Sequence, residues 1–213
     1  MKFNILSLFF ITKCLCCDKI IEYGEYLCDD CMKSWQSELI DCAGDVIHLA
    51  KYDKLRDTVS KTLIFKMKRR NYRRLYEFLA GEMLKAIEIK LPDYHDYIIT
   101  NVPRMRDSVK ENGLDHAQLF AEMIAVKSGM KYMNPLKHKG RAVQKLAAGY
   151  EDRFKNAEKA FVIRNKFNNN LSGYKFLVAD DITTSGATLK TCGRILLDNG
   201  AADVKYAAIC GGN

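Results

Sequence analysis

The sequence has no long run of apolar residues. Its longest apolar stretch, residues 5–11, is interrupted by Ser7 and is far shorter than the ~18 residues that a membrane-spanning helix needs. The sequence therefore predicts no membrane span, and it shows no internal repeat. Lys2 gives this stretch the look of a short signal peptide, but Thr12 and Lys13 make a poor cleavage site. We interpret the stretch as a short helix that packs on the core.

Acidic residues are absent between Lys61 and Tyr76, and the whole chain is basic, with a formal net charge of +8. A basic balance is typical of phosphorylated or nucleic-acid partners, but it is a weak indicator by itself. One interpretation of the acid-free stretch is a solvated helical surface. The other interpretation is a phosphate-contacting surface on which Tyr72 stacks on a base. The basic residues of this second interpretation are Lys66, Lys68, Arg69, Arg70 and Arg73, beside Lys61 and Arg74.

The eight cysteines are unevenly spread, since five of them fall between Cys14 and Cys31. Such clustering favours a metal site over a disulfide scaffold. Cys14 and Cys17 form one C-x-x-C hook, and Cys28 and Cys31 form a second hook soon after it. Four thiolates in this pattern predict one tetrahedral Zn²⁺ with a structural role, because four protein ligands close the coordination shell.

Cys16 leaves an alternative open, because it can replace a neighbour as ligand or remain a spare, reactive thiol. A redox dithiol pair is a further alternative, but the βαβ pattern expected around such a pair is missing. The negative charge of four thiolates can be offset by Lys13, Lys19 and Lys33. We interpret the other cysteines as small core residues: Cys42, Cys192 and Cys210.

Residues 176–188, FLVADDITTSGAT, combine an apolar run, two acids and a run of small and hydroxyl residues. The apolar run predicts a buried strand with Asp180 and Asp181 at its carboxyl end, followed by a loop and an amphipathic helix. Loops at that edge of a parallel sheet bind ligands, and the N-terminus of a helix offers N–H groups to a phosphate. Two carboxylates beside a phosphate need sugar hydroxyls or a divalent metal to face. The stretch therefore predicts a sugar-phosphate site.

This stretch resembles the phosphoribosyl pyrophosphate (PRPP) signature of type I phosphoribosyltransferases. The resemblance implies that Asp180 and Asp181 hold the ribose hydroxyls, directly or through Mg²⁺. It also implies a 5′-phosphate loop made of Thr183, Thr184, Ser185, Gly186, Ala187 and Thr188. The alternative is an ordinary strand, turn and helix with an exposed acidic tip.

The remaining pattern predicts further strands and helices. Strands are expected at residues 45–52, 97–102, 160–163 and 204–210, and we take 97–102 as the first strand of the sheet proper. Two helices follow residue 54, a third begins at Asp115 with a capping box to Gln118, and the helix after the motif ends at Asn199 and Gly200. Residues 136–156 are polar and basic, and we interpret them as a lid or binding loop, with a solvated loop as the alternative.

The order of parts along the chain resembles the ComF family of competence-associated proteins. These parts are the four-cysteine hooks, the basic segment, Val102-Pro103, the basic loop and the PRPP signature. The resemblance includes Gln144, Leu146, Arg153, Asn156 and Phe161. It implies an α/β fold with a type I phosphoribosyltransferase-like parallel sheet flanked by helices at 45–213, and an N-terminal helix and zinc-binding segment at 1–44. It also implies a cytoplasmic protein of nucleoside metabolism, linked in some members to natural transformation.

The resemblance fails after Val102-Pro103, where the family usually shows Arg-Gly-Phe-Asn-Gln. This chain has Asn112-Gly113-Leu114-Asp115-His116, so an arginine and an Asn-Gln pair are lost. The base and pyrophosphate contacts of that segment are therefore not predicted here. His116 is a candidate substrate contact, but a histidine at a helix start is more often a surface residue, and we expect the latter.

The resemblance implies transfer of phosphoribose from PRPP to a nitrogen acceptor, with release of pyrophosphate. Arg104 is our candidate for contacting the pyrophosphate, beside the acid pair, while Lys139, Arg141 and Lys145 would close over the site. The alternative function is that of a non-catalytic protein with a sensing or vestigial PRPP pocket. Its partner would be single-stranded DNA or a DNA-uptake helicase.

Overall fold

The computed structural model describes residues 11–40, 44–51, 56–69, 72–105, 109, 113–140, 160–167 and 170–211. Several predictions concern residues outside these ranges: the helix at 5–11 except for its last residue, Cys42, Arg70, Arg141, and the rest of the basic loop up to residue 156. Within the described ranges, no helix is long and apolar enough to cross a membrane.

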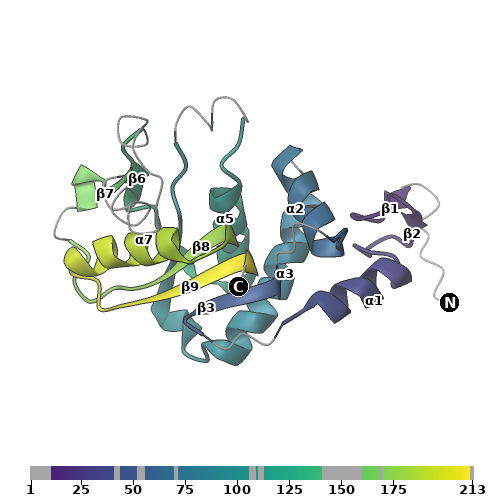
Figure 1. Ribbon diagram of the computed structural model, residues 1–213. Coiled ribbons are helices and arrows are strands. Elements are labelled where there is room, and N and C mark those ends of the chain that lie inside the picture. The colour runs from purple at the N-terminus through teal and green to yellow at the C-terminus, as the bar shows by residue number, and fades with distance from the viewer. Residues whose placement is uncertain are drawn as a thin grey trace.

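Five parallel strands form the central sheet, in the order β3-β9-β8-β4-β5. Figure 1 labels the three neighbours β3, β9 and β8. The inner strands of a parallel sheet are covered on both faces, which explains their apolar runs. Helices cover the sheet, so the predicted fold class, a parallel α/β sheet flanked by helices, is confirmed. The strands are β3 (Val46–Lys51), β4 (Tyr97–Asn101), β5 (Lys131–Tyr132), β8 (Lys175–Thr183) and β9 (Asp203–Gly211).

The strand at 97–102 is not the first strand of the sheet, so that prediction is wrong. β3 precedes it in the chain and pairs with β9, with Val46 opposite Tyr206. β4 lies inside the sheet between β8 and β5. The mixed polarity of residues 45–52 hid this role, because β3 is an edge strand and has one sheet neighbour in the described structure.

Helices α3 (Arg73–Lys90) and α5 (His116–Ser128) pack on one face of the sheet, and α7 (Ala187–Asp198) packs on the other. The start predicted for α5 is confirmed, because the Asp115 carboxylate accepts from the Gln118 N–H at 3.1 Å. The helix ends at Gly129, whose φ of 73° is in the left-handed region that glycine adopts without strain.

Side chains of β8 alternate between two cores. Leu177 and Ala179 pack in the core under α3 and α5, whereas Phe176 and Val178 pack in the core under α7. All four side chains are fully buried, and each large one contributes roughly 1.5–3 kcal/mol. β8 is therefore held from both faces, and its carboxyl end is a fixed place for functional side chains.

The four-cysteine segment packs at one end of the molecule (Figure 1). It consists of the hairpin β1 (Thr12–Lys13) and β2 (Ile20–Ile21) and the helix α1 (Asp29–Glu38), which packs on α2 (Val59–Arg69). Trp35 of α1 is fully buried, and its indole N–H donates to the Glu82 carboxylate of α3 at 2.8 Å. The segment is therefore joined to the sheet domain through α2 and α3.

A second hairpin lies at the other end of the molecule in the same view (Figure 1). Strand β6 (Leu136–His138) pairs antiparallel with β7 (Phe161–Ile163). The strand expected at 160–163 is confirmed, but the interpretation of residues 136–138 as loop is wrong, since β7 supplies a pairing partner that local sequence does not reveal. Single 3₁₀ turns occupy Tyr94–Asp96 and Asn165–Phe167.

Candidate functional site

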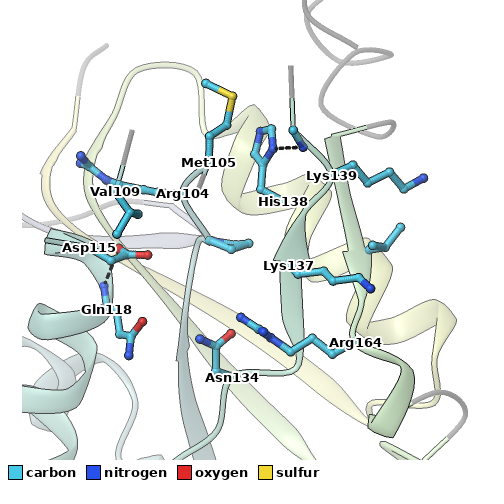
Figure 2. Close-up of a pocket in the computed structure, with 13 residues that line it drawn as sticks. Arg104, Met105, Val109, Asp115, Gln118, Asn134, Lys137, His138, Lys139 and Arg164 are labelled. Carbon is cyan, nitrogen blue, oxygen red and sulfur yellow. Dashed lines mark hydrogen bonds between the residues drawn. The ribbon is translucent and has the colours of Figure 1, made fainter. Parts of the chain in front are cut away.

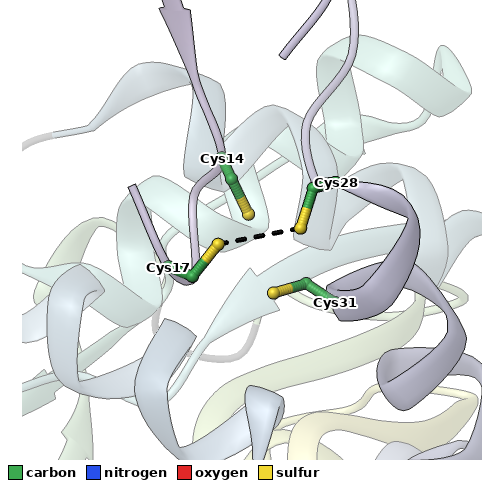
Figure 3. Close-up of side chains that lie close together, drawn as sticks. All are labelled: Cys14, Cys17, Cys28 and Cys31. Carbon is green, nitrogen blue, oxygen red and sulfur yellow. Dashed lines mark hydrogen bonds between the residues drawn. The ribbon is translucent and has the colours of Figure 1, made fainter. Parts of the chain in front are cut away.

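The four predicted cysteine ligands lie together (Figure 3). The sulfur atoms of Cys14, Cys17, Cys28 and Cys31 are all within 4.8 Å of one another, and the sulfurs of Cys17 and Cys28 are 3.7 Å apart. Tetrahedral Zn²⁺ with Zn–S bonds of about 2.3 Å requires sulfur separations of about 3.8 Å. The cluster is thus close to the size that one zinc ion requires.

Local backbone structure brings each hook to the cluster. In the first hook, the Cys14 N–H donates to the Lys19 carbonyl at 2.8 Å, and Asp18 takes a positive φ of 61° to close the turn. In the second hook, Cys28 is the N-cap of α1, and Cys31 therefore lies in its first turn. A turn and a helix start both point backbone N–H groups inward, which favours anionic sulfur.

The acid–base properties of the thiols also fit a cation. Burial raises the pKa of Cys14, but hydrogen bonds from the backbone of Cys17, Cys28 and Cys16 outweigh it and lower the pKa to about 7. Burial and the neighbouring thiols raise the pKa of Cys31. A divalent cation relieves this mutual resistance to ionisation, so the donor set suits Zn²⁺. Cys16 is not a member of the cluster.

The two acids of the motif lie inside β8, not after it. The strand continues to Thr183 because β9 continues to pair with it, as far as Thr183 opposite Gly211. On its other side, pairing with β4 ends at Ala179, opposite Asn101. The prediction that the strand ends before the acid pair is therefore wrong, yet Asp180 and Asp181 do project beyond the end of β4.

Asp181 is surrounded by hydrogen-bond donors and cations. Its Oδ1 accepts from the Ile182 N–H at 2.8 Å. Its Oδ2 contacts Arg104 Nη2 at 2.6 Å and Lys68 Nζ at 3.2 Å. The side chain is only 7% exposed, so these contacts are partly shielded from water. Arg104 follows β4, whereas Lys68 comes from the last turn of α2.

The two carboxyl groups titrate differently. Burial and the charge of Asp181 raise the pKa of Asp180 well above its usual range. Burial also opposes ionisation of Asp181, but Lys68 and Arg104 outweigh it, and the pKa of Asp181 is lowered. Asp181 is therefore the firmly ionised member of the pair, and Asp180 is the member that resists ionisation.

The small and hydroxyl residues at 183–188, which we call the hydroxyl loop, connect β8 to α7. Gly186 is the N-cap of α7 with a φ of 71°, a left-handed conformation that favours glycine. Its N–H donates to Thr183 Oγ1 at 2.9 Å, which shapes the turn. Thr184, Ser185 and Thr188 are exposed, so their hydroxyls face solvent at the N-terminus of a helix. This is the geometry expected of an anion-binding loop.

A cavity of about 820 Å³ opens next to this edge of the sheet (Figure 2). Asp115 and Gln118 at the start of α5 form one side, and β6 with Arg164 forms the other. Arg104 lines the cavity and also contacts Asp181. Among the described residues, those of the hydroxyl loop do not line it, so Arg104 connects the cavity to the motif.

Lys137, Lys139 and Arg164 bring positive charge to the β6–β7 side of the cavity. In Figure 2 the amino groups of Lys137 and Lys139 extend away from Asp115 and Gln118, whereas the Arg164 side chain runs toward Asn134. Arg164 is held by a 3.0 Å hydrogen bond from its Nε to the Leu136 carbonyl. The role predicted for Lys139 in binding PRPP stays a prediction.

Sequence reasoning missed four polar residues of the cavity as site residues. They are Asp115, Gln118, Asn134 and Arg164. The sequence indicates Asp115 and Gln118 only as a helix cap and does not single out Asn134 and Arg164. Each of the four lies at the end of a strand or the start of a helix, where ligands bind.

His116 is buried, so the expectation that it is a surface residue is wrong. It is 1% exposed, and its Nδ1 is 2.7 Å from the hydroxyl of Tyr76 on α3. Its Nε2 has no hydrogen-bond partner among the described residues. Burial lowers the pKa of His116, and nearby Arg104 lowers it further. The close packing of α3 on α5 explains the burial, and sequence periodicity does not reveal which helices pack together.

The basic residues of α2 and α3 are largely engaged within the molecule. Lys66 Nζ donates to the Cys16 carbonyl and to the Asp18 carboxylate, both at 2.9 Å. Arg69 lies 4.0 Å from the ring centroid of Phe65, and Arg73 pairs with Glu77 at 2.9 Å. Basic residues of the acid-free stretch thus pair with acids from outside it. These contacts do not decide between a solvated surface and a phosphate-contacting surface.

Comparison with known proteins gives structural similarity only. A scan of protein-family models and a search of curated proteins find no match. Similar solved structures include a glutamine PRPP amidotransferase from B. subtilis (18% identity, TM-score 0.40, covering 71% of this chain and 26% of that one). Two further examples are an adenine phosphoribosyltransferase from Saccharomyces cerevisiae (17%, 0.42, 66% and 70%) and a hypoxanthine phosphoribosyltransferase from Staphylococcus aureus (11%, 0.37, 62% and 61%).

These similarities are low in identity and in TM-score, and the chain spans only about a quarter of the amidotransferase chain. The assignment of the fold therefore depends on the parallel sheet and its helices.

Proposed function

We propose that the carboxyl edge of the sheet binds PRPP and that the protein is a phosphoribosyltransferase-like member of the ComF family. The observation that carries the proposal is the position of Arg104. It contacts the acid pair at Asp181 and also lines the adjoining cavity. A ligand with a ribose at one end and a pyrophosphate at the other matches this arrangement.

The 5′-phosphate is assigned to the loop between β8 and α7. The exposed hydroxyls of Thr184, Ser185 and Thr188 and the N–H groups at the start of α7 offer several donors to one phosphate. The ribose would then lie over Asp180 and Asp181, whose oxygens accept from sugar hydroxyls. Carboxylate oxygens are also the donor type that Mg²⁺ prefers, and Mg²⁺ bound with PRPP would help to neutralise the pyrophosphate.

Pyrophosphate departure needs positive charge more than a protein nucleophile. The bond between the anomeric carbon and oxygen breaks with oxocarbenium character, so the protein mainly positions the reactants and stabilises charge on the leaving group. Arg104 is placed for this task. The acceptor would enter the 820 Å³ cavity, where Asp115, Asn134 and Arg164 offer both accepting and donating groups.

Membership of the ComF family is supported by the order of the parts along the chain. The four-cysteine cluster, the α2–α3 segment, the Val102-Pro103 loop and the acid pair all occur in sequence and fold into one structure. In this proposal Zn²⁺ has a structural role at the four cysteines.

The test is calorimetric binding of PRPP with Mg²⁺. Wild-type protein should bind, and the Asp180→Asn/Asp181→Asn variant should lose at least tenfold in affinity. Asp57→Asn is the matched control, because Asp57 is fully exposed just before α2 and, among the described residues, its ion pair is with Lys61 at 3.2 Å. Absence of binding by the wild type would refute the pocket. Release of pyrophosphate in a screen of free bases and small amines would then identify the acceptor.

A second function, binding of single-stranded DNA, is supported by a separate groove. Between the four-cysteine segment and α2, two adjoining hollows of about 210 and 350 Å³ are lined by aromatic and basic side chains. Phe65 is 53% exposed and Tyr72 is 37% exposed. Aromatic rings stack on bases and cations follow the phosphates. The lining residues with these properties are Lys13, Phe65, Lys66, Arg69, Tyr72, Arg73 and Arg74.

This second function has its own test. Binding of a labelled single-stranded oligonucleotide should weaken with rising salt, and Phe65→Ala/Tyr72→Ala should weaken it at least fivefold. Tyr174→Ala is the control, because it removes a 43% exposed aromatic ring that lines neither hollow, and it should leave binding unchanged. An oligonucleotide affinity that changes neither with salt nor in Phe65→Ala/Tyr72→Ala would exclude this groove as the DNA-binding surface.

A further inference from the structure

Asp181 has two counter-ions on a single oxygen atom. Arg104 and Lys68 both contact Oδ2, at 2.6 and 3.2 Å. One cation is enough to balance one carboxylate, so the second is free to change partners at little cost to the acid. Arg104 also lines the cavity, whereas Lys68 is not among its lining residues. The cation that can turn to a ligand is therefore Arg104, and the one that stays is Lys68.

Lys68 is held by a helix that is attached to the four-cysteine segment. Two residues before it on α2, Lys66 donates to the Cys16 carbonyl and pairs with Asp18, both in the first cysteine hook. The Lys66 side chain is 23% exposed, so this contact is partly shielded from water. The carboxyl-terminal turn of α2 is thus fixed between the cysteine hook and the acid pair.

The amino-terminal end of α2 is attached to the same segment. The two carboxylate oxygens of Glu38 accept from the N–H groups of Val59 and Ser60 at 2.7 and 2.8 Å. Glu38 is the last residue of α1, the helix that begins at the second cysteine hook. The first turn of α2 has no acidic residue of its own, so Glu38 supplies the negative charge that a helix start favours.

We propose that the four-cysteine segment, acting through α2, positions Lys68 on Asp181 so that Lys68 remains as counter-ion when Arg104 turns to the ligand. This inference depends on the proposed function, because the ligand is taken to be PRPP. Lys68 is a positioning residue in this scheme. The segment would then be a support of the sugar-phosphate site as well as a separate structural unit.

The first test compares PRPP affinity among charge variants on α2. Lys68→Met should weaken binding about tenfold, since Arg104 must then stay on Asp181. Lys68→Arg keeps a cation within reach and should stay within threefold of wild type. Lys61→Met removes the same charge from the same helix and should change affinity by less than twofold. Equal effects of Lys68→Met and Lys61→Met would overturn the proposal.

The second test asks whether the segment acts through Lys68. Glu38→Gln and Lys66→Met keep all four cysteines, and each should weaken PRPP binding about threefold in the wild-type background. In the Lys68→Met background they should have no further effect, because the path they act through is already broken. Effects that add fully in the double variants would overturn the linkage.

A measurement without ligand separates this inference from the proposed function. The Ile182 N–H donates to Asp181 Oδ1, so its NMR shift reports the orientation of that carboxylate. Glu38→Gln and Lys68→Met should both move this shift, and Lys61→Met should not. If wild type fails to bind PRPP, the role of Arg104 toward the ligand falls with the proposed function. An unmoved Ile182 shift in Glu38→Gln would overturn the support by α2 even if PRPP binds.

Discussion

The four thiols and the two carboxylates are both clusters of groups that become anionic, but the chain treats them differently. The thiols of Cys14, Cys17, Cys28 and Cys31 face one another, in an arrangement sized for an external cation. Asp181 instead meets two cations of the protein itself, Lys68 and Arg104. The difference teaches that one cluster has the spacing of a set of metal ligands, whereas the other finds its counter-ions within the protein.

Removing the metal should have the largest effect. We expect about one zinc per chain in freshly reduced protein, and Cys28→Ser should lower the free energy of unfolding by more than about 3 kcal/mol, because metal binding is part of folding in such segments. Metal analysis and chemical denaturation measure both. Cys16→Ser is the control, since Cys16 lies outside the cluster. Well under one zinc per chain in wild type would contradict the comparison.

Asp181→Asn should cost less, about 1–2 kcal/mol. It leaves Lys68 and Arg104 close together without a carboxylate, but their exposure of 39% and 26% lets water screen them. The pKa of Asp181 is lowered in the folded protein, so its stabilisation is present above pH ~3.9 and is lost as the pH falls below that value. Thermal unfolding from pH 7 to pH 3 should show the gap to wild type closing. A gap that does not depend on pH would point to a packing effect instead.

Asp180→Asn should have a smaller effect of opposite sign. Burial and the charge of Asp181 raise the pKa of Asp180, so its ionisation destabilises the fold as the pH rises above ~3.9. We expect the Asn variant to be roughly 1 kcal/mol more stable at pH 7. The gain should vanish near pH 4, where wild type is protonated. Loss of stability at pH 7 would mean that the Asp180 charge is compensated.

The smallest effect is expected at the surface of the cysteine segment. Lys19 pairs with Asp30 at 3.9 Å, and both side chains are well exposed. Lys19→Met should therefore change stability by less than about 0.5 kcal/mol and zinc affinity by less than twofold. A larger fall in zinc affinity, measured by competition with a chelator, would show that Lys19 offsets the thiolate charge after all.

The sequence predicts what is local in each cluster. C-x-x-C spacing, the apolar run before Asp180 and the cap at Asp115 are all short-range signals, and the structure has the corresponding elements. The parallel order of the sheet follows from strands that alternate with helices. The roles of the site residues toward a ligand stay predictions.

What sequence could not supply is long-range pairing. Lys68 meets Asp181 and Tyr76 meets His116 only because α2, α3 and α5 pack beside the sheet. The extension of β8 through the acid pair depends on β9. No spacing rule within one segment encodes these contacts, so the sequence pattern alone indicates a basic surface at Lys68 and an exposed His116.

The sheet order also sets when the protein can fold. β3 lies near the start of the sheet domain, and its sheet partner β9 is the last strand described. During synthesis β3 must wait for nearly the whole chain, and such distant pairing is slow. The four-cysteine segment and α2 use contacts made much earlier. The hydrogen bonds from α2 to Glu38 span 21 and 22 residues of the chain, whereas the contact of Lys68 with Asp181 depends on β8.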